Sequence, residues 1–181
     1  MNQLFIDNSW TLFLDRDGVI NKEKHLGYIN EWEEFKFYDG ALEAFKIFAS
    51  RFKYIIIVTN QRGIGRGITK LENLEIVHKN MTNEIVISGG KIDGIYYCAD
   101  LDINSTHRKP RTGMAFDAQK NLPDIDFKKS VMVGNNISDM EFGHAIGAKT
   151  ILLLTTMEEI PAPITYLTAT YKTLLEFAES L

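Results

Sequence analysis

Short apolar segments recur along the chain and predict the strands of a buried sheet. Residues 10–14 and the β-branched run 54–58 are too short for helices and are followed by polar residues. Segments of similar character lie at residues 93–99, 130–134 and 149–155. Near-continuous apolar runs are typical of strands that are covered on both faces, as in a parallel sheet.

Longer amphipathic segments separate these runs and predict helices. Residues 39–52 and 69–86 repeat their apolar positions with helical spacing, and Thr69 with Glu72 predicts a capping box at the start of the second. Further helices are expected at residues 112–122, 137–147 and 171–181. The alternation of the two kinds of segment predicts an α/β fold of three layers, Rossmann-like, with a mainly parallel sheet and helices on both faces.

The composition changes this picture little. The chain has 181 residues without a linker or repeat, which fits a single domain over 1–181. A net charge of −4 gives no sign of a nucleic-acid or membrane partner. Cys98 is the only cysteine, no signal-peptide pattern opens the chain, and the apolar runs are too short to span a bilayer. We therefore expect a cytoplasmic monomer or small homo-oligomer.

Polar side chains gather where the predicted strands end. Because functional residues of parallel sheets collect at the carboxyl ends of the strands, we expect these side chains to share one crevice. In chain order they are Asp15 and Asp17, Thr59 and Asn60, Arg108 and Lys109, and Asn135 with Asp139 one helical turn later.

This set of side chains suits phosphoryl transfer. One carboxylate can act as a nucleophile and form an aspartyl-phosphate, while a second protonates the leaving oxygen and later activates water. Mg²⁺ would neutralise the facing acids, and a lysine and a threonine hydroxyl would stabilise charge on the transferred oxygens. A metal and a lysine would thus offset the cost of ending a buried strand with two acids.

Each of these signals also has a plain structural reading. An Asp-x-Asp pattern after a strand often forms a turn, and Thr-Asn pairs are common in turns. Arg108 and Lys109 alone would be solvated charges, and Asp139 alone would be an acid favoured in a first helical turn. Their joint occurrence at four successive strand ends favours an active site over four coincidences.

Two other motifs carry less weight. Residues 61–67, "QRGIGRG", follow a strand, but the glycines are spaced GxGxG and begin late, so we expect a flexible loop rather than a dinucleotide site. Its Arg62 or Arg66 would be free to meet a substrate anion. Cys98 and His107 alone do not complete a four-ligand zinc site, and structural Zn²⁺ is not expected.

Four stretches resemble the motifs of the haloacid-dehalogenase-like (HAD-like) phosphatases. They are "FLDRDGVIN", "TNQRGIGRG", "RKPRTGM" and "VGNNISDMEFGHAIGA", and the resemblance extends over residues 10–154. Within this family the motifs look most like the heptose-bisphosphate phosphatase branch, with the histidinol-phosphate phosphatases next. The resemblance implies a HAD-like fold and a Mg²⁺-dependent phosphomonoesterase acting on a small phosphorylated metabolite.

The resemblance also implies roles for individual residues. Asp15 resembles the nucleophile and first Mg²⁺ ligand, and Asp17 the general acid/base, whose backbone carbonyl also binds the metal. Thr59 resembles the phosphate-binding hydroxyl and Lys109 the lysine that stabilises the phosphoryl group. The residues expected to bind substrate are Asn60, Gln61, Arg62, Arg66 and Arg108.

The sequence departs from the family pattern in two places. Asn135 stands where the family has a metal-binding aspartate, so the metal set becomes Asp15, Asp17 and Asn135, with Asp139 as a possible source of the missing charge. Relatives also carry a zinc loop of cysteines and a histidine, of which Cys98 remains, while Asp100, Ser105 and His107 stand near the other ligand positions. The intervals between the motifs leave no room for a cap domain. A catalytically impaired binding domain stays open as the alternative to an enzyme.

Overall fold

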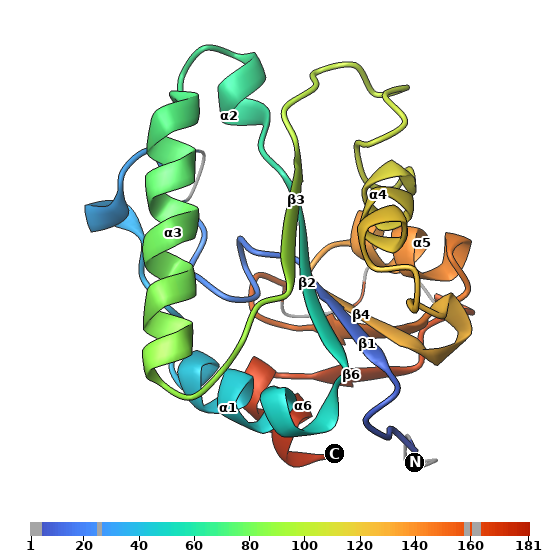
Figure 1. The fold of residues 1–181 in the computed structure, drawn as a ribbon. Helices are drawn as coiled ribbons and strands as arrows, with labels where there is room; N and C mark the ends of the chain where they lie inside the picture. The colour runs from blue at the N-terminus through green and yellow to red at the C-terminus, as the bar shows by residue number, and fades with distance from the viewer. Residues whose placement is uncertain (1–4, 25–26, 158–159, 161–163) are drawn as a thin grey trace.

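Six parallel strands form one sheet in the order β3-β2-β1-β4-β5-β6, as the computed structural model shows (Figure 1). The structure describes residues 5–24, 27–157, 160 and 164–181. The strands are β1 (Thr11–Leu14), β2 (Tyr54–Asn60), β3 (Gly94–Cys98), β4 (Ser130–Gly134), β5 (Lys149–Leu153) and β6 (Ala169–Tyr171). The parallel sheet predicted from the alternation is therefore confirmed.

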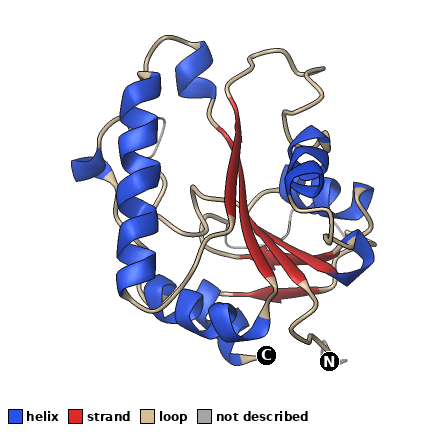
Figure 2. Cartoon of the chain, viewed as in Figure 1, coloured by secondary structure: helices blue, strands red, loops and turns tan. Residues whose placement is uncertain are grey.

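Helices cover both faces of this sheet and complete three layers (Figure 2). Helices α1 (Ala41–Arg51), α3 (Leu71–Ile87) and α6 (Leu174–Glu179) lie on one side, and α4 (Gly113–Asn121) and α5 (Ile137–Ala145) lie on the other. The short elements are η1 (Trp32–Glu34), α2 (Arg62–Gly65) and η2 (Phe127–Lys129). In the described part of the chain, none of the intervals between elements holds a separate cap domain.

Alternation along the strands builds two apolar cores. Leu12 and Leu14 of β1 pack among residues of α1 and α6, whereas Phe13, between them, packs among residues of α4 and α5. Successive residues of a strand point to opposite faces of the sheet, and helices cover both faces. All three side chains are therefore fully buried. The near-continuous apolar runs in the sequence follow from this double coverage.

Three predicted details are wrong. Lys70, not Thr69, precedes the first turn of α3, and Thr69 Oγ1 donates to Asn30 Oδ1 at 2.6 Å instead of capping the helix. Residues 61–67 are not all loop, because α2 occupies part of them. The predicted helix over 171–181 begins only at Leu174, where the side chain of Thr173 caps it, and β6 ends just before.

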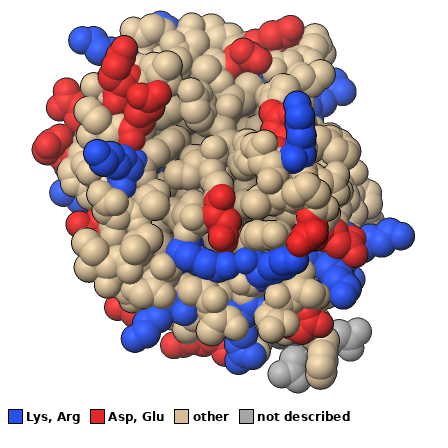
Figure 3. All heavy atoms as spheres, in the orientation of Figure 1, with Lys and Arg blue, Asp and Glu red and all other residues tan. Residues whose placement is uncertain are grey.

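Acidic and basic side chains are interspersed on the face of the molecule shown in Figure 3. This mixture agrees with the small net charge of −4. Among the described helices, none is long and apolar enough to cross a bilayer.

Candidate active site

The carboxyl ends of β1, β2 and β4 open onto one cavity, as predicted for a parallel sheet. Asp15 follows β1 directly, and its backbone N–H donates to the carbonyl of Val133 in β4 at 3.0 Å. The cavity has a volume of about 180 Å³. It is lined by Asp15, Asp17, Glu23, Thr59, Asn60, Lys109, Asn135, Asn136, Ser138 and Asp139.

Lys109 is the centre of this cavity. Its Nζ lies 2.8 Å from Asp15 Oδ1 and 2.7 Å from Asp139 Oδ1, and it donates to the carbonyl of Val58 at 2.8 Å. Asn60 holds the lysine backbone from both sides, accepting from its N–H at 3.0 Å and donating to its carbonyl at 3.3 Å. Residues that are far apart in the sequence are therefore joined by one buried ammonium group.

Burial governs the charges of this group. It raises the pKa of Asp15 to about 7, and the nearby Asp139 adds to the rise while the Lys109 ammonium opposes it. Burial alone would lower the pKa of Lys109, but Asp139 and Asp15 hold the pKa of this lysine above its ordinary value. The ammonium is therefore the fixed charge of the cavity, and the Asp15 carboxylate is a poorly solvated anion beside it.

Asp17 points toward a different set of partners. Arg16 Nη2 lies 2.7 Å from Asp17 Oδ2, and Asn21 and Gln61 donate to the same carboxylate at 2.9 and 3.0 Å. Burial would raise the pKa of Asp17, but the Arg16 charge and these hydrogen bonds hold it below its ordinary value. Gln61 Nε2 also donates to Thr59 Oγ1 at 2.9 Å, so that Asp17 and Thr59 share one amide.

Asn135 sits against the turn that follows Asp17. Gly18, with a φ of +82°, packs so closely that a Cβ on it would lie 2.0 Å from Asn135 Nδ2. The same Nδ2 donates to Thr156 Oγ1 at 2.9 Å. A side chain at position 18 would displace Asn135, which explains the glycine.

Asp139 lies in the first turn of α5, where both of its oxygens have partners. Oδ1 binds Lys109, and Oδ2 accepts from the backbone N–H of Asn136 at 3.0 Å. The Asn136 side chain accepts in return from Ser138 N, which completes a capping box. These contacts favour a role for Asp139 in holding the lysine rather than in binding a metal.

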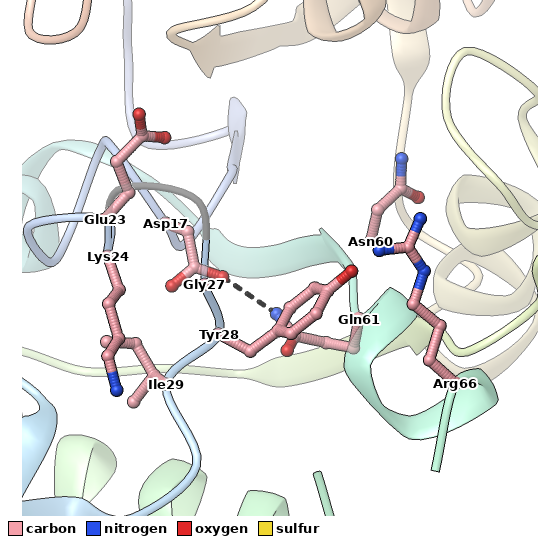
Figure 4. A pocket seen from close by; sticks show the side chains of 9 residues that line it. All are labelled: Asp17, Glu23, Lys24, Gly27, Tyr28, Ile29, Asn60, Gln61 and Arg66. Atoms are coloured by element: carbon pink, nitrogen blue, oxygen red, sulfur yellow. Dashed lines mark hydrogen bonds between the residues drawn. The ribbon is translucent and has the colours of Figure 1, made fainter. Parts of the chain in front are cut away.

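The three arginines expected near substrate are separated. Arg66 lines a second cavity of about 430 Å³, where its guanidinium lies 5.9 Å from the centre of the Tyr28 ring (Figure 4). Arg108 donates to the carbonyl of Asp100 at 3.2 Å. Arg62 lines neither cavity, and its Nε is buried without a hydrogen-bond partner among the described residues.

The second cavity adjoins the first. Asp17, Glu23 and Asn60 line both. In Figure 4 the guanidinium of Arg66 extends toward Asn60, whose amide group points away from it and bonds to the Lys109 backbone. Glu23, Lys24 and Tyr28, which come from the loop after β1, contribute to the second cavity. None of these three was predicted as a site residue, because the loop has no periodic pattern.

The side chains that were weighed as zinc ligands have protein partners in this structure. Cys98 Sγ lies 3.8 Å from Ser105 Oγ, which itself donates to Asp100. His107 Nε2 lies 2.9 Å from Asp117 Oδ2. The side chains of Cys98 and His107 therefore have different partners, although the His107 backbone N–H also donates to Ser105 Oγ, at 3.4 Å.

The donors around Asp15 fit a magnesium ion. The part of the chain that is described holds no cluster of three or more His, Cys, Asp or Glu side chains arranged for a metal. Asp15 can offer a carboxylate, Asp17 a backbone carbonyl and Asn135 an amide oxygen, and all three residues line the same cavity. Mg²⁺ commonly binds one or two carboxylates and completes its octahedron with water and phosphate oxygens, so this sparse set suffices.

Comparisons with known proteins find phosphatases among the relatives of this chain. A family model described as HAD-hydrolase-like matches residues 106–168. The chain is 39% identical over 143 residues to the D-glycero-alpha-D-manno-heptose-1,7-bisphosphate 7-phosphatase of Campylobacter jejuni, and the match covers 79% of this chain and 81% of that protein. The enzyme of the same name from Mycobacterium tuberculosis is 34% identical over 142 residues, covering 78% and 75%.

Solved structures give the same result. The crystal structure of D,D-heptose 1,7-bisphosphate phosphatase from B. bronchiseptica, complexed with magnesium and phosphate, matches with a TM-score of 0.84 and 25% identity over 94% of this chain and 96% of that one. A HAD-superfamily hydrolase from Geobacter sulfurreducens, 13% identical with a TM-score of 0.59, shares the fold. This chain belongs to the HAD-like phosphatases, in the family of the D-glycero-D-manno-heptose-1,7-bisphosphate 7-phosphatases.

Proposed function

We propose that this protein is a Mg²⁺-dependent phosphatase that removes the 7-phosphate of D-glycero-D-manno-heptose 1,7-bisphosphate through an aspartyl-phosphate on Asp15. The observation that carries the proposal is the buried Lys109 ammonium, which lies within 2.8 Å of both Asp15 and Asp139 at the carboxyl edge of the sheet. An ammonium held there can stabilise negative charge on a phosphoryl group that is transferred to Asp15.

In the first half-reaction, a carboxylate oxygen of Asp15 attacks phosphorus and the bond from phosphorus to the sugar oxygen breaks. Asp17 must enter this step protonated, against the contacts that lower its pKa, and it gives this proton to the departing oxygen. Lys109 and the Thr59 hydroxyl bind the transferred oxygens. Mg²⁺, when bound by Asp15, the Asp17 carbonyl and Asn135, supplies charge neutralisation between the carboxylate and the phosphate.

In the second half-reaction, Asp17 takes a proton from water and the water oxygen attacks phosphorus. The acyl-phosphate bond then breaks, which releases phosphate and restores the Asp15 carboxylate. The Asp17 side chain is 29% exposed and lines both cavities, so it borders the space where the leaving oxygen and the water would stand.

The second cavity supports a sugar substrate with a further anionic group. Its volume of about 430 Å³ suits a small ligand, and it begins at Asp17 and Asn60. Arg66, with Tyr28 stacked beside it, offers a guanidinium to a second phosphate. Gln61 borders the same cavity. Direct substrate contacts of Arg62 and Arg108 have less support, since their side chains line neither cavity.

A substrate assay with Asp15→Asn tests the proposal. We expect phosphate release from heptose 1,7-bisphosphate with Mg²⁺, much slower release from histidinol phosphate, and loss of activity by more than about a thousandfold in the variant. Asparagine is nearly isosteric with aspartate but cannot form the acyl-phosphate, so circular dichroism should remain unchanged.

Asp124→Asn serves as the matched control, because this exposed carboxylate pairs only with Lys53, far from the cavity. It should keep full activity. Asp15→Asn activity within tenfold of the unmodified protein would contradict the nucleophile assignment, and a preference for histidinol phosphate would contradict the substrate.

A further inference from the structure

A buried cationic side chain lies behind Asp17. Arg16 is fully buried, and it is the largest side chain in the described part of the molecule to be so. Its Nε and Nη2 both donate to Asp17, with distances of 3.2 Å and 2.9 Å to Oδ1 and 2.7 Å to Oδ2. The guanidinium therefore grips the carboxylate with two nitrogens, which fixes its plane as well as its position.

The remaining terminal nitrogen of Arg16 is held by His78 of α3. Arg16 Nη1 lies 3.1 Å from His78 Nε2, and the imidazole is buried. Guanidinium nitrogens only donate, so His78 Nε2 must be the acceptor and the ring proton must be on Nδ1. The contact thus requires a neutral histidine in one tautomer.

These contacts connect His78, in the middle of α3, with the carboxylate of Asp17. The connection runs from His78 through Arg16 to Asp17, and Gln61 braces it because its Oε1 accepts from Arg16 Nη2 at 3.3 Å while its Nε2 donates to Asp17. No residue of the connection other than Asp17 and Gln61 lines either cavity. Its effect on a substrate must therefore pass through Asp17, which Arg16 holds directly, or through Gln61, which also donates to the Thr59 hydroxyl.

We infer that His78 is a positioning residue: by accepting from Arg16 it fixes the guanidinium that orients the Asp17 carboxylate for proton transfer. This inference rests on the proposed function, in which Asp17 protonates the leaving oxygen. Removing the acceptor leaves a buried N–H without a partner, and Arg16 must move to find one. Asp17 then loses the grip that sets its direction.

Proton transfer can be separated from packing by the leaving group. p-Nitrophenolate departs readily without a proton, whereas phenolate depends more strongly on one, and the two phosphate esters are close in size. A misplaced general acid should therefore lower kcat/KM for phenyl phosphate more than for p-nitrophenyl phosphate. A purely structural defect should lower both by the same factor.

The experiment measures kcat/KM for both esters, with saturating Mg²⁺, in His78→Leu and His78→Gln. We expect His78→Leu to lose about tenfold or more on phenyl phosphate and only a few-fold on p-nitrophenyl phosphate. His78→Gln places an amide oxygen near the position of Nε2 and should restore most of the loss. Val77→Ala, a packing change beside it on α3, should lower both values equally if it lowers them at all.

Asp17→Asn separates failure of the inference from failure of the proposed function. If this variant loses equal factors on both esters, then Asp17 is not the acid and the inference falls with it. If Asp17→Asn loses more kcat/KM on phenyl phosphate than on p-nitrophenyl phosphate but His78→Leu does not, only the role of His78 is overturned. A rise in the activity of His78→Leu would overturn that role as well. Should His78→Leu fail to fold, Arg16→Lys removes the two-nitrogen grip from the other end and must show the same discrimination.

Discussion

One ammonium group determines the chemistry available at this site. Lys109 is buried among Asp15, Asp139 and the carbonyl of Val58, all within 2.8 Å. Burying such charges is expensive, and removing one partner leaves the others unpaired. Asp139 is therefore best understood as the permanent partner of the lysine, since its second oxygen caps α5, while Asp15 is the partner with an oxygen available for reaction.

At the same scale, the amide of Asn135 leaves the metal position one negative charge short. If its oxygen binds Mg²⁺, Asn135→Asp should tighten metal binding, because carboxylates hold hard cations largely through charge. Thr156 Oγ1, which accepts from Asn135 Nδ2, can donate to a carboxylate instead. We expect the Mg²⁺ concentration for half-maximal activity to fall about fivefold, or roughly 1 kcal/mol, after repulsion from Asp15 is subtracted.

A Mg²⁺ titration of phosphatase activity at fixed ionic strength measures this change. Asn83→Asp, which adds the same charge at an exposed position of α3, is the control for a general electrostatic effect. An unchanged or weaker Mg²⁺ requirement in Asn135→Asp would place Asn135 outside the metal shell.

At the scale of the element, α3 shows how an apolar face can carry one polar contact. Its buried residues are Leu74, Val77, His78, Met81 and Ile85, a helical stripe with a single polar member. Burial and the Arg16 charge lower the pKa of His78 to about 3, and the more distant Asp17 opposes this only in part. The folded protein therefore keeps this histidine neutral over most of the acid range.

This neutral histidine makes the protein sensitive to acid. At pH values between the ordinary pKa of histidine, about 6.5, and the pKa of His78 in the folded protein, the unfolded chain binds a proton at His78 and the folded chain does not. The free energy of unfolding therefore falls as the pH falls. From pH 7 to pH 5 we expect His78 to cost the protein about 1 to 2 kcal/mol. Urea unfolding at both pH values should show this loss, and His78→Gln should lose correspondingly less. An identical loss in the variant would disprove the assignment.

At the scale of the whole molecule, the sequence predicts which residues meet in the cavity better than it predicts which partner each side chain binds. Strand order along the chain and the rule for parallel sheets were enough to bring Asp15, Thr59, Lys109 and Asn135 to one cavity. The local sequence pattern could not show that the Asp17 carboxylate binds Arg16, because the position of Arg16 depends on His78, which lies on α3. The capping box predicted at Thr69 was wrong for the same reason, since a distant residue decides the partner.

Elements that depend on tertiary contacts were the ones missed. The residues around Thr69 fit the pattern of a capping box, yet the Thr69 hydroxyl donates to the side chain of Asn30, which lies in a distant loop. Strand β6 has only three residues, which is too short for a periodic pattern, and it pairs along the edge of β5. Helix α2 contains two glycines within four residues, which argues against a helix on propensity alone.

The same arrangement makes activity depend on the complete fold. Asp15, Thr59, Lys109 and Asp139 follow the strands β1, β2, β3 and β4, so loss of any of these four strands disperses the cavity. We expect urea to abolish activity and circular dichroism with one midpoint, as in a cooperative single domain. Measuring KM at each urea concentration controls for weakened substrate binding. Activity that disappears well before the circular dichroism signal would reveal an independently melting site.

A practical consequence concerns preparations that contain some misfolded material. Since a half-assembled sheet cannot bring Asp15 and Asp139 to the Lys109 ammonium, we expect each molecule either to turn over at the full rate or not to turn over at all. Specific activity then counts intact molecules, much as an active-site titration does. A variant that lowers specific activity without changing KM should therefore first be checked for the fraction of chains that are folded, before its residue is given a chemical role.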